Sequence, residues 1–526
     1  MRSGHFALFT PLVLACLAFA QETATGFVYH DANGDGSRNS EEAGVPDVLV
    51  SNGSEVVRTD AQGRYELPVT DDTALFVIKP AGWMVPLNEV NLPQFYYLHK
   101  PEGSPELEYA GVEPTGPLPD SVDFALLRKE DEDTFRMLLI GDPQPYNQQQ
   151  VDYFIEDIVE DAMQIEDIAF GMTLGDIVGD DLTLFSPLNR GIARLGVPWW
   201  NVYGNHDMNF DAPTDELADE TYERVFGPAT YAFQWGEVWF IVLDNVIYPT
   251  PPELKRKYVG GVTEQQFAFL ENLLAEIPTD DLVVFAQHIP LFVEEAFGET
   301  YRLEDRERLL SLFENHPRTL SVSGHTHYVR QEEFDAEDGW PHPQPHVHLH
   351  YNAGAGAGSW WSGPPNEHGI PMTTMRDGTP NGYSILEFDG TDWMPFWKSA
   401  GKSIEKQMHL FVPEVVPGSA GYPQEFFVNF YLGKEGDAVR YRIGDGDWRE
   451  ARFRVRPDPA YMQLWLEHNY NEGLPDGPPL PAPEPSHHLW SARLPGGLEP
   501  GKHTLTVEAT DSWGRTFTET AEFRVK

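Results

Sequence analysis

Five short motifs in the middle of the chain carry side chains that could hold metal ions. In chain order they are Asp142-Pro143-Gln144, Gly175-Asp176-Ile177-Val178-Gly179-Asp180, Gly204-Asn205-His206-Asp207, His288 and Gly324-His325-Thr326-His327. Carboxylate, amide and imidazole groups are the mixed oxygen and nitrogen donors that bind pairs of divalent ions. A single histidine is more often a satisfied core residue than a ligand, but five motifs of this kind are difficult to explain in that way. The set therefore predicts a two-metal site.

Each motif directly follows a short apolar run, which indicates how the chain positions these groups. Runs such as Met137–Ile140, Ile168–Leu174 and Leu282–Ala286 are typical of buried strands. A side chain just beyond a strand stands at the carboxyl edge of the sheet, where α/β proteins place their sites. His325 and His327 are two residues apart, so in extended backbone they would point the same way. We therefore expect all five motifs at one edge of an α/β sheet.

The residues around the motifs predict a multidomain α+β protein with three parts. Between about residues 134 and 400, strand-like runs alternate with helical patterns, which indicates a central α/β sandwich. Residues 22–130 show short strand patterns separated by glycine turns, which indicates an N-terminal all-β domain. Apolar and polar residues alternate again over 405–526, and we predict a C-terminal immunoglobulin-like β-sandwich there.

The order and content of the five motifs resemble those of the calcineurin-like metallophosphoesterase superfamily. Its pattern is D-x-H/Q, G-D-x-x-G/Y-D, G-N-H-D/E, H and G-H-x-H, and the resemblance covers about residues 134–400. The three-part architecture resembles that of a secreted bacterial subgroup. The resemblance implies that one metal ion is bound by Asp142, Gln144, Asp176 and His327. It implies that the other is bound by Asp176, Asn205, His288 and His325, so that Asp176 bridges the two ions.

The resemblance also implies a reaction. A hydroxide that bridges the two ions would attack the phosphorus of a phosphate ester in line. His206 would face the phosphate and assist the leaving oxygen, while Asp207 would orient the ring of His206. The substrate would be a small-molecule or headgroup phosphate ester, and we favour a diester over a monoester.

Two positions within the motifs bear on the identity of the metals. Gln144 stands where many members of the family have histidine, and its amide oxygen is a harder donor that favours Mn or Fe(II) over Zn. Gly179 stands where purple acid phosphatases have a tyrosine ligand, so an Fe(III) site of that kind is not expected. The implied cofactors are therefore two divalent ions, Mn, Fe or Zn.

A further, structural metal site is predicted in the N-terminal domain. Asp31, Asn33, Asp35 and Glu42 follow the calcium-loop spacing D-x-N-x-D-G-x5-E, although strands rather than helices flank the loop. The segment resembles prealbumin-like or B-type repeats of bacterial surface proteins. The alternative is a turn rich in Asp, Asn and Gly that needs no ion.

Two clusters after the last motif each have two interpretations. Trp360, Trp361 and Tyr383 could stack on a substrate, or they could be core residues. The histidines that alternate over 346–350 could bind a third metal ion. We favour a strand with these polar residues facing outward, because no acidic residues accompany them.

The composition limits the partners of the protein. The 526 residues include 83 acidic and 36 basic side chains, a formal net charge of −47. This charge disfavours nucleic-acid polymers and anionic membranes as partners. No apolar run reaches the ~20 residues of a membrane span.

The first residues predict export from the cytoplasm. Residues 1–20 have the basic start, apolar stretch and small final residues of a signal peptide, so we expect a secreted or periplasmic protein. Cys16 is the only cysteine, which excludes thiolate metal ligands in a mature chain that lacks it. The alternative is lipid attachment at Cys16 after Val13-Leu14-Ala15, which would give a cell-surface lipoprotein.

The two flanking β domains suggest a rival function of another class. The protein could be a surface adhesion or carbohydrate-binding protein whose central domain is a non-catalytic scaffold. The complete set of motifs distinguishes the two readings, because a decayed site should have lost some of its ligands. None is missing.

Overall fold

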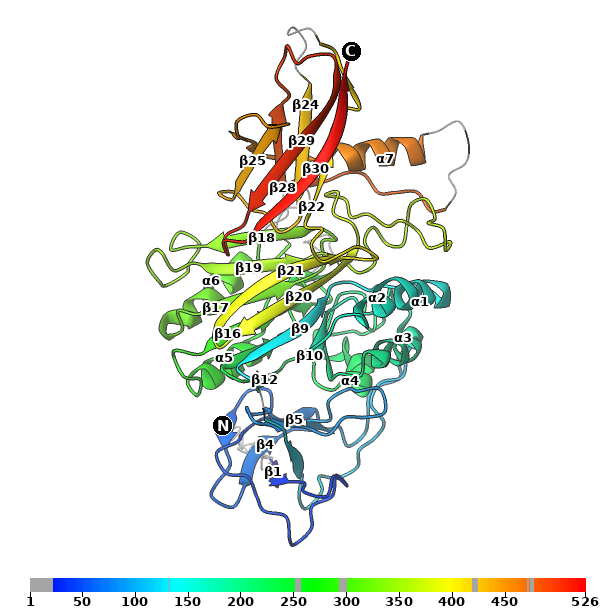
Figure 1. Cartoon of the computed structure of the whole chain (residues 1–526). Helices are drawn as coiled ribbons and strands as arrows, with labels where there is room; N and C mark the ends of the chain where they lie inside the picture. The colour runs from blue at the N-terminus through cyan, green and yellow to red at the C-terminus, as the bar shows by residue number, and fades with distance from the viewer. Residues whose placement is uncertain are drawn as a thin grey trace, which may run out of the picture.

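The computed structural model describes residues 22–130, 132–250, 257–292, 300–418, 424–470, 473 and 477–526. These residues form three regions that follow one another along the molecule (Figure 1). The predicted signal peptide and Cys16 lie outside the described residues. Within the described ranges, no helix is both long and apolar enough to cross a membrane.

The N-terminal region contains two four-stranded sheets, in the orders β4-β1-β8-β6 and β3-β2-β5-β7. The strands are β1 (Glu22–His30), β2 (Leu49–Ser51), β3 (Val56–Arg58), β4 (Arg64–Val69), β5 (Thr73–Val77), β6 (Trp83–Met84), β7 (Tyr96–His99) and β8 (Phe124–Arg128). In β1 the alternate residues Ala24, Gly26 and Val28 are buried, as expected for a strand with one face on a core. This region is all-β, as predicted.

The central region is a sandwich of two sheets with helices on its outer sides (Figure 1). One sheet has the order β11-β10-β9-β20-β21 and the other β12-β13-β16-β17-β19-β18. Their strands are β9 (Thr134–Ile140), β10 (Ile168–Leu174), β11 (Trp199–Val202), β12 (Tyr231–Trp235), β13 (Val238–Val242), β16 (Leu282–Ala286), β17 (Thr319–Ser323), β18 (Val329–Phe334), β19 (His348–Ala353), β20 (Gly382–Asp389) and β21 (Asp392–Ser399). The predicted α/β sandwich is confirmed.

Most helices of the central region connect parallel strands of one sheet, whereas α4 (Glu220–Phe226) lies between β11 of the first sheet and β12 of the second. The helices are α1 (Gln148–Phe154), α2 (Glu160–Ala162), α3 (Phe185–Ile192), α4 (Glu220–Phe226), α5 (Glu264–Leu274) and α6 (Leu303–Ser311), and a short hairpin pairs β14 (Val246–Ile247) with β15 (Val259–Gly260). β9, β10 and β11 are parallel to one another, as are β13, β16, β17 and β19. Parallel strands bring their carboxyl ends to one edge of each sheet.

The C-terminal region is a β-sandwich of two sheets with the orders β22-β24-β28-β27 and β23-β30-β29-β25-β26. Its elements are β22 (Met408–Phe411), β23 (Val415–Val416), β24 (Glu425–Phe430), β25 (Ala438–Ile443), β26 (Arg449–Glu450), β27 (Arg452–Pro457), α7 (Pro459–Asn469), β28 (Pro485–Arg493), β29 (Gly501–Thr510) and β30 (Thr516–Val525). In β29 the alternate residues Leu505, Val507 and Ala509 are buried.

The N-terminal region shares a hydrophobic core with the central region. Phe95 packs on Trp200 with ring centroids 5.3 Å apart, and Phe76 meets Phe269 at 5.7 Å. The apolar residues of the C-terminal sandwich, such as Phe430, form a separate cluster. The first two regions therefore behave as one packed unit, and the third has its own core.

The alternating histidines of β19 form a buried ladder of hydrogen bonds rather than a polar outer face. His348 and His350 are fully buried. The ring of His348 lies between the hydroxyls of Thr319 and Ser321 at 2.7 and 2.8 Å, and His350 lies between Ser321 and Ser323 at 2.6 and 2.9 Å. The prediction that they face outward is wrong, because hydroxyls on the neighbouring strand satisfy the imidazoles inside the core. Burial lowers the pKa of His348 to about 3, so it is neutral.

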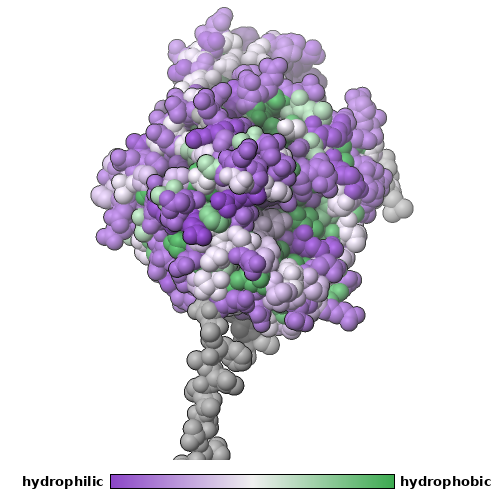
Figure 2. Space-filling model, turned by 90° about the horizontal axis from the view of Figure 1, so that it is seen from below, coloured by the Kyte–Doolittle hydropathy of each residue, from purple (hydrophilic) through white to green (hydrophobic). Residues whose placement is uncertain are grey.

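The surface at the N-terminal end of the molecule is mainly hydrophilic. Figure 2 shows this face, with hydrophobic residues only in small separated spots. This distribution agrees with the excess of acidic over basic residues.

A buried ion-pair cluster joins the N-terminal and central regions. The ammonium of Lys100 lies 2.6 Å from Glu220, 3.2 Å from Glu223 and 3.0 Å from Asp72. The side chains of Lys100 and Glu220 are 6% and 0% exposed. Burial raises the pKa of Glu223 to about 7, although the ammonium of Lys100 opposes that shift. A single lysine thus compensates carboxylates from both regions.

Replacing Lys100 by methionine should destabilise the protein strongly. The variant would leave the fully buried Glu220 without its counter-ion, which costs about 3–5 kcal/mol in comparable cases. Lys502→Met is the matched control, because Lys502 pairs with Glu522 at the surface, with exposures of 64% and 58%. That change should cost less than about 1 kcal/mol. Urea unfolding of both variants measures the difference, and equal losses would contradict the role given to Lys100.

Candidate metal centre

The five predicted motifs meet at one edge of the central sandwich, where strands of both sheets end. β9, β10 and β11 of the first sheet end there, together with β16 and β17 of the second. The side chains that follow these strand ends are Asp142, Asp176, Asn205, His288 and His325. The expected clustering at a carboxyl edge is therefore present, and two sheets rather than one contribute to it.

Left-handed backbone turns point the donor side chains into the site. Positive φ angles occur at Asp142 (43°), Gln144 (40°), Asp176 (47°), His325 (73°) and His327 (54°). Non-glycine residues rarely adopt this conformation, and it concentrates at functional sites. The prediction that His325 and His327 lie in extended backbone is wrong, because each forms a sharp turn instead.

Two glycines allow the motif loops to approach each other closely. A Cβ atom on Gly204 would lie 2.0 Å from the backbone nitrogen of Asp176. A Cβ on Gly324 would lie 2.4 Å from Oδ2 of Asp142. These glycines are therefore required by the packing of one motif against another.

The donor atoms of the centre lie within a few ångströms of one another. Ligand atoms of Asp176, His288 and His325 are all within 4.8 Å of one another. Nε2 of His288 is 3.2 Å from Oδ1 of Asp176 and 3.1 Å from Oδ1 of Asn205. Nε2 of His327 is 3.5 Å from Oδ1 of Asp142. Neighbouring donors at these separations can share a cation.

The hydrogen bonds around the centre leave its donor atoms available for metal ions. Nδ1–H of His288 donates to Leu174 O (2.8 Å), and Nδ1–H of His327 donates to Gly358 O (2.6 Å), which leaves both Nε2 atoms as donors. The amide nitrogen of Gln144 donates to the hydroxyl of Tyr146 at 3.2 Å. Its oxygen is buried and has no hydrogen-bond partner among the residues that the structure describes. Such an orphaned oxygen fits a metal ligand, so the residues present suit the predicted ions.

The charges in the centre also fit a cation site. Asp142 and Asp176 are 0% and 2% exposed. Burial raises the pKa of Asp142 well above its usual range, and the nearby carboxylate of Asp176 adds to the rise, whereas His288 opposes it. Burial lowers the pKa of His325 and of His327 to about 3, so both imidazoles are neutral and able to coordinate. Burial lowers the pKa of His288, but Asp176 and Asp142 outweigh burial and raise it to about 9, so a bound divalent ion would take the place of its proton beside the carboxylates.

His206 stands beside the donor set with a different partner from the one predicted. Its Nδ1–H donates to Oδ1 of Asp180 at 2.6 Å, and its backbone N–H donates to Asp176 at 2.8 Å. Burial lowers the pKa of His206, but Asp176 and Asp180 outweigh burial and raise it to about 9. Nδ1 is thereby occupied, and Nε2 is the nitrogen left for the pocket.

The role predicted for Asp207 requires a correction. Its carboxylate accepts backbone N–H groups of Ile177 (3.1 Å), Val178 (3.1 Å) and Gly204 (3.0 Å). Asp207 therefore fastens the second motif to the third and does not orient the ring of His206. Asp180 takes that role, since it lies on the open side of the loop while Asp207 is fully buried.

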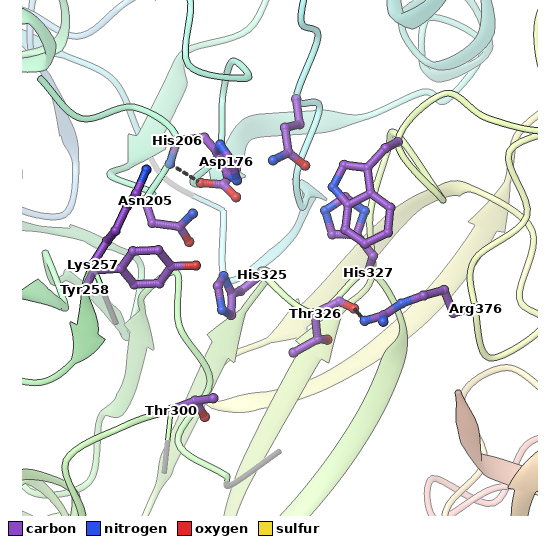
Figure 3. A pocket seen from close by; sticks show the side chains of 12 residues that line it. Asp176, Asn205, His206, Lys257, Tyr258, Thr300, His325, Thr326, His327 and Arg376 are labelled. Carbon is purple, nitrogen blue, oxygen red and sulfur yellow. Dashed lines mark hydrogen bonds between the residues drawn. The ribbon is translucent and has the colours of Figure 1, made fainter. Parts of the chain in front are cut away.

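A cavity of about 430 Å³ opens over the centre. The donors Gln144, Asp176, Asn205, His325 and His327 line its floor with His206. Figure 3 shows Lys257 and Tyr258 on the side of His206, and Arg376 on the side of His327. These wall residues lie outside the motifs, so they could not be found from the sequence pattern. Asp180 and Tyr146, in contrast, lie within or beside motifs and could have been found there.

The aromatic cluster after the last motif divides between the two interpretations. Trp361 and Tyr383 are buried core residues, 1% and 0% exposed. Trp360 lines the cavity and stacks on the ring of His327, with centroids 4.1 Å apart and planes at 22°. One face of the Trp360 ring is thus covered by His327, a histidine of the candidate metal centre.

Comparison with known sequences assigns the chain to a class of proteins. The calcineurin-like phosphoesterase domain matches residues 135–329, the N-terminal region of such proteins matches 32–109, and their C-terminal region matches 350–517. The chain therefore belongs to the calcineurin-like phosphoesterases, a family of phosphoric ester hydrolases.

Two individual proteins resemble this chain. One is a probable glycerophosphodiester phosphodiesterase of Arcobacter nitrofigilis, 26% identical over 140 residues. That match spans 26% of this chain and 48% of the relative, about half its length. The other is the solved structure of a purple acid phosphatase from yellow lupin (Lupinus luteus) seeds. It has 12% identity and a TM-score of 0.37, and the match covers 68% of this chain and 69% of that one.

Proposed function

We propose that the protein hydrolyses small phosphate diesters with two bound divalent metal ions. One ion would be held by Asp142, Gln144, Asp176 and His327, and the other by Asp176, Asn205, His288 and His325. The observation that carries the proposal is the buried and unpartnered oxygen of Gln144 among carboxylates and neutral imidazoles. The complete donor set also argues against the adhesion-protein alternative.

The chain's own residues prepare the leaving group to depart. When bound, the ions would activate water and neutralise charge on the phosphoryl oxygens. His206 lines the cavity with Nδ1 held by Asp180, so its Nε2 can donate a proton to the leaving oxygen. The raised pKa of His206 keeps that proton in place near neutral pH.

The charge of the cavity walls favours a diester over a monoester. Lys257 and Arg376 are the lysine and arginine among the described residues that line the cavity. Among the described residues, the guanidinium of Arg376 pairs with Glu484 at 3.1 Å, and no such ion pair involves Lys257. A diester carries one negative charge and a monoester about two near neutral pH, so a wall with a single lysine cation suits the diester better.

The donor set also bears on the metals. Gln144 offers an amide oxygen where an imidazole would favour Zn, and the hydroxyl of Tyr146 fixes that amide. The site should therefore prefer Mn or Fe(II) over Zn.

The predicted calcium loop lies between β1 and β2. The carboxylate of Asp31 accepts N–H groups of Gly34 (2.8 Å) and Gly36 (2.8 Å). Glu42 is 8% exposed; within the described part of the chain its Oε1 has no hydrogen-bond partner, while Oε2 accepts from the backbone N–H of Asn39 (3.0 Å). An oxygen buried in this way supports calcium binding over a plain turn.

A first experiment measures hydrolysis of bis-p-nitrophenyl phosphate and p-nitrophenyl phosphate after reconstitution with Mn, Fe(II), Zn, Ni or Mg. We expect metal-dependent turnover with the diester preferred, and none in Asp176→Asn, which removes the shared ligand. No turnover with any metal, together with no bound metal by elemental analysis, would refute the proposal.

The same assay tests the partner of His206. Asp180→Asn removes one of the two charges that raise the pKa of His206 and weakens the bond that orients its ring, so we expect kcat to fall about 10²-fold with unchanged metal content. Asp181→Asn is the matched control, because Asp181 instead accepts from the backbone of Thr183 at the surface. If the two variants were equally active, Asp180 would not be the residue that supports His206 in catalysis.

Calcium should raise the thermal stability of the metal-loaded enzyme. At a calcium concentration of 100 times Kd, binding would contribute about 2.7 kcal/mol. Glu42→Gln should abolish the effect, whereas Glu41→Gln, at the exposed neighbouring position, should preserve it. A melting temperature that is the same with and without calcium in the unchanged protein would identify the loop as a plain turn.

We further propose that the protein acts outside the cytoplasm, either secreted or periplasmic. The proposal rests on the signal-peptide pattern of residues 1–20 and on the acidic composition. Mass spectrometry of the protein recovered from its native cells should show a chain that begins at Gln21. A mass that includes residues 1–20 would contradict export, and a lipid on Cys16 would establish the anchored alternative.

A further inference from the structure

Residues 354–380 connect β19 to β20 and lie between the metal centre and the C-terminal sandwich; we name them the bridging segment. The segment lacks regular secondary structure over most of its length. It contains Trp360 and Arg376, which line the cavity. Its contacts on both sides show how the C-terminal region reaches the metal centre.

On the side of the metal centre, the bridging segment supports one metal-binding subsite. Gly358 O accepts the Nδ1–H of His327 at 2.6 Å, and Trp360 stacks on the same ring at 4.1 Å. The backbone N–H of Ala357 donates to Asp142 O at 3.0 Å. The indole N–H of Trp361 donates to Pro143 O at 3.1 Å, next to Gln144. The segment thus holds the ring of His327 directly and the backbone at Asp142 and Pro143, whereas the amide of Gln144 is fixed by the hydroxyl of Tyr146.

Arg376 links this subsite to the C-terminal region. Its Nη2 donates to Thr326 O at 3.0 Å, one residue before His327. Its Nη1 donates to Oε1 of Glu484 at 3.1 Å, and the N–H of Glu484 donates back to Arg376 O at 3.1 Å. The two side chains are 11% and 25% exposed, so solvent screens the pair only in part. Glu484 immediately precedes β28 of the C-terminal sandwich.

Further contacts anchor the bridging segment to the C-terminal sandwich. Oδ2 of Asp377 accepts the backbone N–H of Val329 and lies 2.9 Å from Nε2 of His488. Asp377 and His488 are each 1% exposed. The side-chain amide of Asn429 donates to Asp377 O at 2.9 Å. A Cβ on Gly378 would lie 2.6 Å from the side chain of Asp458, so the two surfaces are tightly packed.

The other metal-binding subsite is supported from inside the central region. His288 is held through Nδ1 by Leu174 O at 2.8 Å, and its backbone N–H donates to Oδ1 of Asn245 at 3.2 Å. The backbone N–H of His325 donates to both oxygens of Asp142, at 3.1 and 2.9 Å, so the central region also anchors that ligand of the first subsite. These supports lie at the strand ends of the sandwich. The two subsites therefore differ in what holds their histidine rings: the bridging segment holds His327, and the central region holds His288.

We propose that the C-terminal region controls occupancy of the subsite formed by Asp142, Gln144 and His327, with Glu484 and Arg376 as positioning residues. Without the Glu484–Arg376 pair, the guanidinium beside Trp360 is no longer fixed against Thr326 O, and the segment that carries Gly358 and Trp360 holds the ring of His327 less firmly. The subsite of Asn205, His288 and His325 keeps its supports. The inference rests on the two-metal site of the proposed function.

The test is metal binding by the full-length protein, measured by titration calorimetry with Mn²⁺ and by elemental analysis after gel filtration. For Glu484→Gln we expect one equivalent of Mn²⁺ to bind as in the unchanged protein and the other to bind at least tenfold more weakly. Arg376→Lys should show the same selective loss, because a lysine cannot bridge Thr326 O and Glu484 at once. It provides a second route if Glu484→Gln fails to fold.

Glu333→Gln is the matched control. Glu333 on β18 pairs with Lys434 of the C-terminal region, and this pair also crosses between regions without touching the bridging segment. It should leave both Mn²⁺ equivalents unchanged. Equal weakening of both equivalents in Glu484→Gln, or no weakening of either, would overturn the proposal.

The outcome is separable from that of the proposed function. An unchanged protein that binds two Mn²⁺ ions but cleaves no phosphate ester would refute the phosphodiesterase activity and leave the metal-binding comparison decisive. An unchanged protein that binds fewer than two ions would overturn both.

Discussion

The structure depends on the burial of two aspartates, Asp142 and Asp176, close together at the edge of a hydrophobic sandwich. Isolated carboxylates in such a place are costly, and the surrounding chain reduces that cost with fixed donors. The N–H of His325 donates to Asp142, and the N–H of His206 donates to Asp176. The left-handed turns and the close glycine contacts follow from this requirement, because they bring backbone donors to buried carboxylates. A bound cation would complete the compensation.

The sequence predicted those features of the site that depend on residues close to one another in the chain. Motif spacing and the apolar runs before each motif predicted that the seven candidate donors would gather at a sheet edge, but not that two sheets would contribute to it. The partner of His206 was less accessible, since Asp207 adjoins His206 in sequence whereas Asp180 lies 26 residues earlier, in the second motif, and only the fold brings it to the ring. The prediction that the histidines of β19 face outward was wrong. Alternation shows that the two faces of a strand differ in polarity, but it does not show which face is buried. Wall residues such as Lys257 lie outside any motif, so only tertiary structure could reveal them.

The flanking regions differ in their relation to the catalytic one. The N-terminal region shares the hydrophobic core of the central region, and Lys100 forms ion pairs across the boundary between the two. The match to the C-terminal part of the family begins at residue 350, within β19, and so includes β20 and β21 of the central sheet. β20 pairs with β9, the strand that leads into Asp142. The division between catalytic and C-terminal parts therefore lies inside the central sandwich in sequence, although the second core begins only near Met408.

The ladder of His348 and His350 has a consequence for the alignment of neighbouring strands. β17 and β19 pair with Ser321 opposite His350 and Ser323 opposite Asn352. A slip by one residue would turn the imidazoles away from every hydroxyl and leave buried nitrogens without partners. The ladder thus fixes the register of β17. It thereby also fixes the point at which this strand ends and the turn that carries His325 begins. Hydrogen bonds in the interior of the sandwich thus determine the position of a site at the edge of the sheet.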